Sequence, residues 1–155
     1  MNLFDAEILA KQLIAEYNPG LNFEWSRSKT AIGDYMWSRR RLRLSRVLIP
    51  LMKRDDVIVT IKHELAHSLA PVNSGHGWEW KRIMINTFNL PAHRCSRADI
   101  NLSQVPNSWR SRCPNGHVGT KTYMRKPTAL RSCGKCNPGR FDSRYIVTYV
   151  QGLTV

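Results

Sequence analysis

The chain has 155 residues, of which 42% are hydrophobic, and a formal charge of +13. This length allows one domain of ordinary size, or a slightly smaller domain with a small appendage. Because no apolar run approaches the roughly 20 residues that cross a bilayer, and because the N-terminus lacks the features of a secretory leader, we expect a cytoplasmic protein, with nucleoid or nuclear association open.

The positive charge is concentrated towards the C-terminal end. Residues 101–155 hold nine Lys/Arg and one Asp/Glu, whereas residues 56–100 hold five and four. So basic a segment favours a polyanionic partner, first of all DNA bound electrostatically and only then a membrane surface. A basic face that only confers solubility is the alternative. We expect no membrane partner and favour a monomer, while the sequence leaves the oligomeric state open.

The first predicted element is a helix that is capped by Asn2 and ends at Asn18-Pro19-Gly20. Its apolar residues recur at helical spacing, so we expect one face to pack on the core. That predicted face consists of Leu3, Phe4, Ile8, Leu9, Leu13, Ile14 and Tyr17.

Three strand-like segments follow, at Leu21–Trp25, Ala31–Trp37 and Arg41–Ser45. They predict a small, mainly antiparallel sheet, with a bend at Gly33-Asp34 and a short helical turn after it at Leu48–Met52. The four arginines between positions 39 and 43 fit either the solvated side of a tight turn or a set of phosphate contacts.

The stretch His63-Glu64-Leu65-Ala66-His67 lies in a helix predicted from Asp55 or Asp56 to about Ala70. His63 and His67 are four residues apart, so both can reach one metal ion from one helix face. Glu64 lies beside them, where a carboxylate can take a proton from water on the metal. Burial of the two histidines and the glutamate would be unfavourable without a ligand, so a buried helix favours a bound metal ion. The apolar residues that predict burial of this helix are Ile58, Val59, Ile61, Leu65, Ala66, Leu69 and Ala70.

A catalytic zinc ion usually has three protein ligands and one water, so the motif needs one more donor. His76 is the predicted third ligand, because it follows the loop at Pro71–Gly75 and begins a helix predicted over His76–Leu90. Glu79, one turn later, is the alternative ligand, although we expect it to orient a histidine instead. The predicted inner face of that helix consists of His76, Trp80, Ile83 and Thr87, with Met84 and Phe88 alongside.

These residues resemble the SprT family of zinc metallopeptidase domains. The resemblance rests on His63–His67, on His76-Gly77-Trp78-Glu79-Trp80-Lys81 and on Leu90–Arg94, and Arg41–Ser45 is similar to the strand before the family's zinc helix. It implies an α+β, zincin-like domain with a His-Glu-His-His site and an intracellular location. For characterised relatives it also implies proteolysis of proteins bound or crosslinked to DNA, and the family often ends in a zinc ribbon.

The C-terminal segment contains two short pairs of metal ligands, which predict a second, structural zinc ion. Cys133 and Cys136 form the stronger pair, because the Gly-Lys turn between them lets both thiolates face one ion. Cys113 and His117 form a less usual first pair. We therefore expect a catalytic domain over residues 1–105 and a basic zinc-ribbon β subdomain over residues 106–155.

Other ligand assignments remain open. His93 and Cys95 could replace the first pair, but we expect Cys95 to be a buried thiol. In an intracellular chain, cysteines are metal ligands or reduced thiols more often than disulfides.

Cations and aromatic residues alternate around the predicted ribbon, which suits phosphate contact and base stacking. The predicted nucleic-acid contacts are Arg110, Arg112, Lys121, Arg125, Lys126, Arg131, Lys135, Arg140 and Arg144. The aromatic residues fit either stacking or a small core for the ribbon itself: Tyr123, Phe141, Tyr145 and Tyr149.

Three functions are consistent with these features. The favoured one is a zinc metalloprotease that cleaves DNA-associated proteins, with water activated by zinc and Glu64. The second is a nucleic-acid-binding protein in which both zinc ions are structural and the peptidase site is vestigial. The third is a zinc peptidase of general specificity whose charge is incidental.

Overall fold

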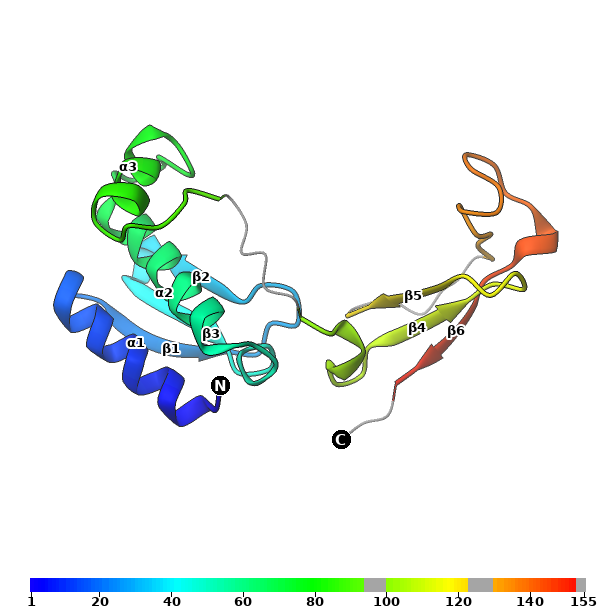
Figure 1. Cartoon of the computed structure of the whole chain (residues 1–155), viewed down its shortest axis with the longest axis horizontal. Helices are drawn as coiled ribbons and strands as arrows, with labels where there is room; N and C mark the ends of the chain where they lie inside the picture. The colour runs from blue at the N-terminus through cyan, green and yellow to red at the C-terminus, as the bar shows by residue number, and fades with distance from the viewer. Residues whose placement is uncertain (94–99, 123–129, 153–155) are drawn as a thin grey trace. The chain divides into compact units, whose positions relative to one another are not determined.

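In the computed structural model, residues 1–93, 100–122 and 130–152 are described, and the chain divides into the units Met1–Ile100 and Asn101–Val155 (Figure 1). The division falls after Ile100, whereas the sequence placed it after Val105. Within the described residues, no helix is long and apolar enough to cross a membrane.

The first unit contains α1 (Leu3–Tyr17), β1 (Asn22–Ser26), β2 (Gly33–Met36), η1 (Trp37–Arg39), β3 (Arg41–Ser45), η2 (Ile49–Leu51), α2 (Arg54–Leu69) and α3 (Trp78–Asn86). The second contains η3 (Leu102–Gln104), β4 (Trp109–Arg112), β5 (Val118–Lys121), η4 (Ser143–Tyr145) and β6 (Thr148–Gln151). Helices thus pack on a small sheet in the first unit and a β unit follows, so the predicted α+β class is confirmed.

Asn2 caps α1 as predicted, and its side-chain oxygen accepts a hydrogen bond of 2.8 Å from the backbone N–H of Asp5. The buried face of the helix consists of Ala6, Ala10 and Ile14. Phe4 is 73% exposed, and Ile8 is exposed too, so the predicted face was wrong at these two positions. The small alanines let the helix approach its neighbours closely, which leaves the larger side chains at the rim.

The sheet of the first unit is mixed rather than mainly antiparallel. Its strand order is β1-β3-β2, with β1 and β3 parallel and β2 and β3 antiparallel. The difference arises because β3 inserts between its two predecessors, so only the tight connection through η1 and the left-handed Arg40 (φ 47°) yields an antiparallel pair. Gly33 and Asp34, predicted as a bend, begin the edge strand β2.

Helix α2 packs on β2 and β3, and α1 packs on α2 and β1, as Figure 1 shows. The buried core therefore lies between the helices and the sheet, around Leu42 and Leu44 of the central strand and Ile61 and Leu65 of α2. The predicted apolar stripe of α2 was wrong at Leu69, which is exposed because the helix ends there.

Helix α3 is shorter than predicted at both ends. A turn over Ser74–Gly77 precedes it. At its C-terminal end, the backbone N–H groups of Phe88 and Leu90 donate hydrogen bonds to the carbonyls of Ile83 and Met84, respectively. Trp80, Met84 and Phe88 are buried as predicted, whereas Thr87 is exposed.

The second unit contains an antiparallel sheet of order β5-β4-β6. Among its described residues, only Val105, Ser108, Cys113 and Cys133 are buried. So small a core supplies little stability by itself, which fits a unit that depends on a metal ion.

We expect Asn2→Ala to lower the free energy of unfolding of the first unit by about 1 kcal/mol, because the first turn of α1 loses its acceptor. Urea denaturation followed by circular dichroism at the helical band measures this loss. Asn2→Ser retains a side-chain oxygen and is the control; an equal loss in both variants would contradict the capping role.

Candidate active site and metal centres

Three histidine side chains converge where α2 meets the loop before α3. The Nε2 atom of His76 lies 3.0 Å from that of His63 and 3.2 Å from that of His67. Three ligands on one tetrahedral zinc ion, at Zn–N distances of about 2.0–2.1 Å, have nitrogens about 3.3 Å apart. The spacing of the three nitrogens therefore fits one zinc ion.

His76 reaches this cluster from a turn and not, as predicted, from the first residue of a helix. The backbone N–H of Gly77 donates a hydrogen bond of 2.9 Å to the carbonyl of Ser74, and α3 begins only at Trp78. A Cβ atom at Gly77 would lie 2.8 Å from that carbonyl oxygen, so the turn that presents His76 requires glycine there.

Trp80 forms a buried wall behind the three imidazoles. Its ring centroid lies 4.8 Å from that of His63, 5.6 Å from that of His67 and 4.6 Å from that of His76. Its indole N–H donates a hydrogen bond of 3.3 Å to the backbone carbonyl of His63. The sequence predicted Trp80 only as a core residue; its position one turn after His76 is the signal for this further role.

Burial, with smaller effects of the neighbouring His67 and His76, lowers the pKa of His63 to about 4. Burial, with His76 as the second cause, also lowers the pKa of His67 to about 4. Both imidazoles are therefore neutral near pH 7, which is the form that binds a metal ion.

Glu64 is only 8% exposed, and burial raises the pKa of its carboxyl group to about 8. The charge of Asp34 raises this pKa too, while the backbone amide of Tyr35 lowers it. A cation held by the nearby histidines favours the carboxylate form, so a metal ion would make Glu64 a proton acceptor.

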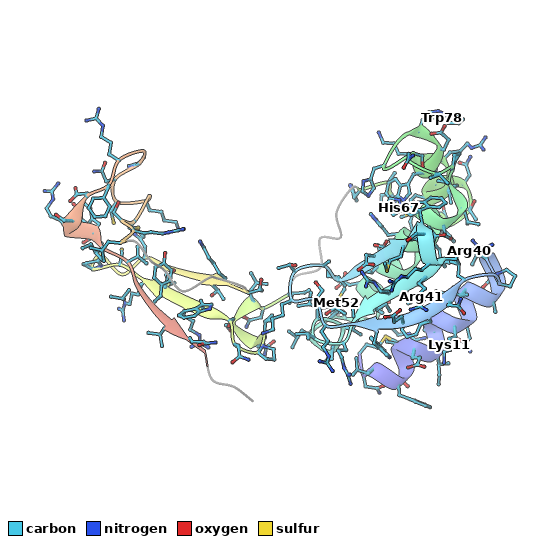
Figure 2. All side chains as sticks on the ribbon, turned by 180° about the vertical axis from the view of Figure 1, so that it is seen from behind. Lys11, Arg40, Arg41, Met52, His67 and Trp78 are labelled. Atoms are coloured by element: carbon cyan, nitrogen blue, oxygen red, sulfur yellow. The ribbon has the colours of Figure 1, made fainter. Side chains whose placement is uncertain are left out.

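Glu64 and the histidines line an open cleft of about 510 Å³. The other lining residues come from β2, η1 and the loop before α3: Gly33, Asp34, Tyr35, Trp37, Asn73 and Gly75. Figure 2 shows His67 nearer to the sheet than Trp78, which is exposed at the outer end of α3. The histidine cluster is therefore open to a ligand on the side of β2.

Glu79, the alternative third ligand, does not join the cluster of potential metal ligands among the described residues. It lies in the first turn of α3, with Oε2 about 3.5 Å from the position of a Cβ atom at Gly77. A role for Glu79 in orienting a histidine remains a prediction.

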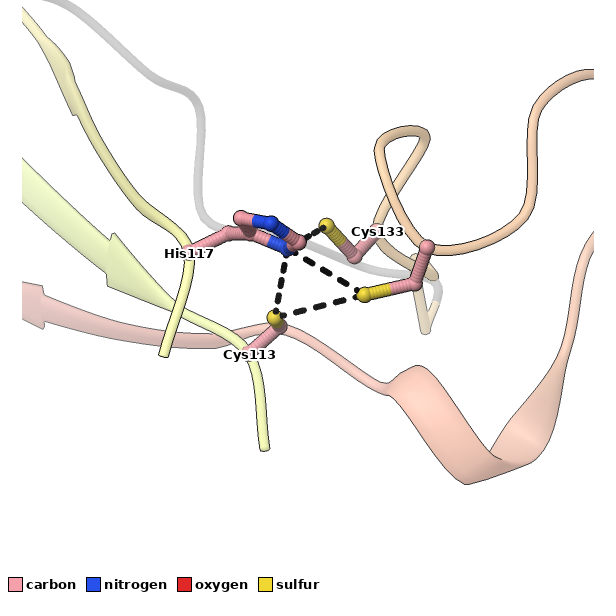
Figure 3. Close-up of side chains that lie close together, drawn as sticks. Cys113, His117 and Cys133 are labelled. Carbon is pink, nitrogen blue, oxygen red and sulfur yellow. Dashed lines mark hydrogen bonds between the residues drawn. The ribbon is translucent and has the colours of Figure 1, made fainter. Parts of the chain in front are cut away.

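The second cluster contains the four predicted ribbon ligands, of which Figure 3 labels Cys113, His117 and Cys133. The sulfur atoms of Cys113 and Cys136 are 3.7 Å apart. The Nδ1 atom of His117 lies 3.6 Å from the sulfurs of Cys113 and Cys133 and 3.2 Å from that of Cys136. Ligands on one tetrahedral zinc ion would have sulfurs about 3.8 Å apart and nitrogen about 3.6 Å from sulfur, so these residues also fit one ion.

Two short turns bring the four ligands together. The backbone N–H of Gly116, with φ of 78°, donates to the carbonyl of Cys113, and that of Cys136 donates to the carbonyl of Cys133. The backbone amides of Cys136 and Lys135 lower the pKa of Cys133 to about 6, which favours the metal-binding thiolate. His93, the alternative ligand, is exposed and joins neither described cluster, and Cys95 lies outside the described residues.

All seven described members of the predicted nucleic-acid set are exposed: Arg110, Arg112, Lys121, Arg131, Lys135, Arg140 and Arg144. Arg144 is already paired with Asp142 at 2.8 Å. Arg125 and Lys126 lie outside the described residues, as does Tyr123. Phe141 is exposed, and Tyr145 and Tyr149 are half-buried, so their predicted roles in stacking or packing remain predictions.

Residues 4–96 match the sequence model of the SprT-like family. Protein SprT of Klebsiella pneumoniae subsp. pneumoniae is 28% identical over 114 residues, which cover 69% of each chain. Protein SprT of Proteus mirabilis is 30% identical over 112 residues, covering 69% of this chain and 66% of that protein. The metallopeptidase zymogen jannalysin of Methanocaldococcus jannaschii aligns with a TM-score of 0.45 and 21% identity, over 53% of this chain and 80% of that chain.

We expect Gly77→Ala to weaken zinc binding at the histidine cluster by about tenfold or more, because overpacking of about 1–3 kcal/mol displaces the turn that carries His76. Competition with a chromophoric chelator measures the affinity. Gly134→Ala is the control, since a Cβ atom there meets nothing within 4 Å. Equal affinities in the wild type and Gly77→Ala would show that the turn does not set the position of His76.

Proposed function

The chain belongs to the SprT-like family, and from this we propose that it is a zinc-dependent metalloendopeptidase in which Glu64 activates water. The observation that carries the proposal is the convergence of three imidazole Nε2 atoms beside a buried carboxyl group in an open cleft. A group of residues that only held a metal would need no such carboxyl group.

The two clusters differ in a way that supports different roles. The histidine cluster offers three ligands and lines a cleft, so a fourth position on the ion stays accessible to water or substrate. The ribbon cluster offers four ligands from three cysteines and His117, which completes a tetrahedron. We therefore assign a catalytic zinc ion to the first cluster and a structural one to the second.

A zinc ion at the first cluster would act as a Lewis acid that polarises the scissile carbonyl and makes water more acidic. His63, His67 and His76 would hold it as neutral ligands. The Glu64 carboxylate takes a proton from the attacking water and delivers it to the nitrogen of the leaving amine.

The edge strand β2 offers a way to bind an extended peptide. Among the described strands it pairs only with β3, and Gly33, Asp34 and Tyr35 line the cleft. A peptide that added to this edge would bind through main-chain hydrogen bonds, which are largely independent of sequence. Such binding would place a scissile bond beside the histidines.

We propose DNA-associated proteins as the substrate class. The second unit carries nine Lys/Arg and one Asp/Glu, and the described cations are exposed. On the central strand β4, Arg110 and Arg112 alternate with Ser111 and so lie on the same face. A row of this kind supports contact with successive phosphates.

We expect Glu64→Gln to retain two zinc ions per chain and to cleave a DNA-bound basic protein at least about 100-fold more slowly, because the amide cannot accept the proton. The measurements are zinc content and cleavage with and without DNA, and a chelator must abolish cleavage. Glu16→Gln makes the same chemical change at an exposed residue of α1, outside both clusters, and is the matched control.

Full activity of zinc-loaded Glu64→Gln would disprove the role of this carboxylate. DNA binding without cleavage by the wild type under any condition would favour the nucleic-acid-binding alternative. Cleavage that is indifferent to DNA would favour a peptidase of general specificity.

For Arg110→Ala/Arg112→Ala we expect weaker DNA binding. We also expect the slope of the logarithm of the DNA association constant against the logarithm of the salt concentration to become shallower, by roughly one unit per lost phosphate contact. Fluorescence anisotropy over a salt series measures both. Lys53→Ala/Arg54→Ala is the matched control, because it removes two exposed cations of the first unit that lie outside the predicted nucleic-acid set. Affinity that did not fall with salt would contradict a phosphate-binding role.

A further inference from the structure

We propose that Gly33 is a positioning residue for Glu64: the missing side chain at this point of β2 makes the space in which the glutamate side chain is held beside the histidines. The inference rests on the proposed role of Glu64 as the base. It extends that role to a strand that contributes no ligand to the metal.

The space at Gly33 is already filled by its neighbours. A Cβ atom there would lie 3.0 Å from Cγ of Glu64, 3.3 Å from Oε1 of Glu64 and 3.0 Å from Cγ2 of Thr60. These separations are below ordinary van der Waals contact, so an alanine at position 33 would force at least one neighbour to move.

Neither neighbour can move freely. Glu64 is 8% exposed and Thr60 is 3% exposed, and both lie on α2, which packs directly on β2. The hydroxyl group of Thr60 donates a hydrogen bond of 2.8 Å to the backbone carbonyl of Asp56, which fixes its rotamer. An alanine at position 33 would therefore displace the Glu64 side chain at least in part.

The backbone conformation does not explain the glycine. Gly33 is absent from the positive-φ glycines, which are Gly75, Gly116 and Gly139 among the described residues. It pairs with Leu44 in regular antiparallel register, where glycine normally weakens a strand. Close approach of the Glu64 side chain is the remaining reason for a glycine at this position.

The same strand also lines the cleft beside the far end of the glutamate. Tyr35 lies two residues along from Gly33 on the same face of β2, and Tyr35 and Glu64 both line the cleft. Gly33 thus admits the Glu64 side chain beside the histidines that line the same cleft. An alanine at position 33 would displace the carboxyl group from this position.

The kinetic test compares Gly33→Ala with Gly20→Ala in the zinc-loaded full chain. The three atoms nearest to a Cβ atom at Gly20 would all belong to the guanidinium group of Arg40, the flexible end of an exposed side chain. For Gly33→Ala we expect kcat to fall about tenfold or more with KM and zinc content unchanged, because small displacements of a catalytic group are costly. Gly20→Ala should retain kcat.

An unchanged kcat in Gly33→Ala, or an equal loss in Gly20→Ala, would overturn the inference. A rise in KM with kcat retained would overturn it as well, because that result assigns Gly33 to substrate binding. If the wild type does not cleave, or if Glu64→Gln retains activity, the proposed function fails instead.

A second measurement tests the contact without using activity. We expect Gly33→Ala to lower the Tm in the wild-type background and to lower it less in a Glu64→Ala background, where the Cγ atom is gone. If Gly33→Ala does not fold in the wild-type background, Glu64→Ala should restore folding. Equal shifts in both backgrounds, or a failure to fold in both, would show that Gly33 does not act through Glu64.

Discussion

The candidate active site depends on the packing of α2 between two unlike surfaces. On one side, Glu64 lies against the edge strand β2, where Gly33 leaves room for it. On the other, the three imidazoles lie against the ring of Trp80 from α3. Buried polar groups of this kind are unfavourable unless something compensates for their desolvation, and a metal ion shared by the histidines would do so. The packing of α2 thus sets both the positions of these side chains and their desolvation, which favours a bound metal ion.

Local spacing accounts for what the sequence could predict. His63 and His67 must share a face because a helix repeats every 3.6 residues, and Cys133 and Cys136 must face each other across a two-residue turn. Their convergence needs little information from the rest of the fold. The Asn2 cap is local for the same reason. Features of this range can be derived from the printed sequence with the rules of helix and turn geometry.

What the sequence could not predict depends on contacts between distant segments. The parallel pairing of β1 with β3 follows from the insertion of β3 between β1 and β2, which no local pattern records. The apolar residues of α1 span more than one face, so their periodicity predicted Phe4 on the buried face. In the structure, the small residues Ala6 and Ala10 are buried instead. Gly33 was predicted as a bend because a glycine next to an aspartate usually marks a turn. An isolated glycine in a strand can also indicate that another group approaches the backbone closely. The position of α2 against β2 in the structure supports this second explanation for Gly33.

The candidate active site and the most basic segment lie in different units of the chain. Every described residue of the histidine site, from Gly33 to Trp80, belongs to the first unit, whereas the four ribbon ligands belong to the second. Among the described residues, the groups assigned to the proposed reaction therefore all come from the first unit. The contribution of the second unit to a peptidase would be to affinity and location, through exposed cations carried by a small core that a metal ion would stabilise. Loss of the ribbon's metal would then change where the enzyme acts before it changes how the peptide bond is hydrolysed.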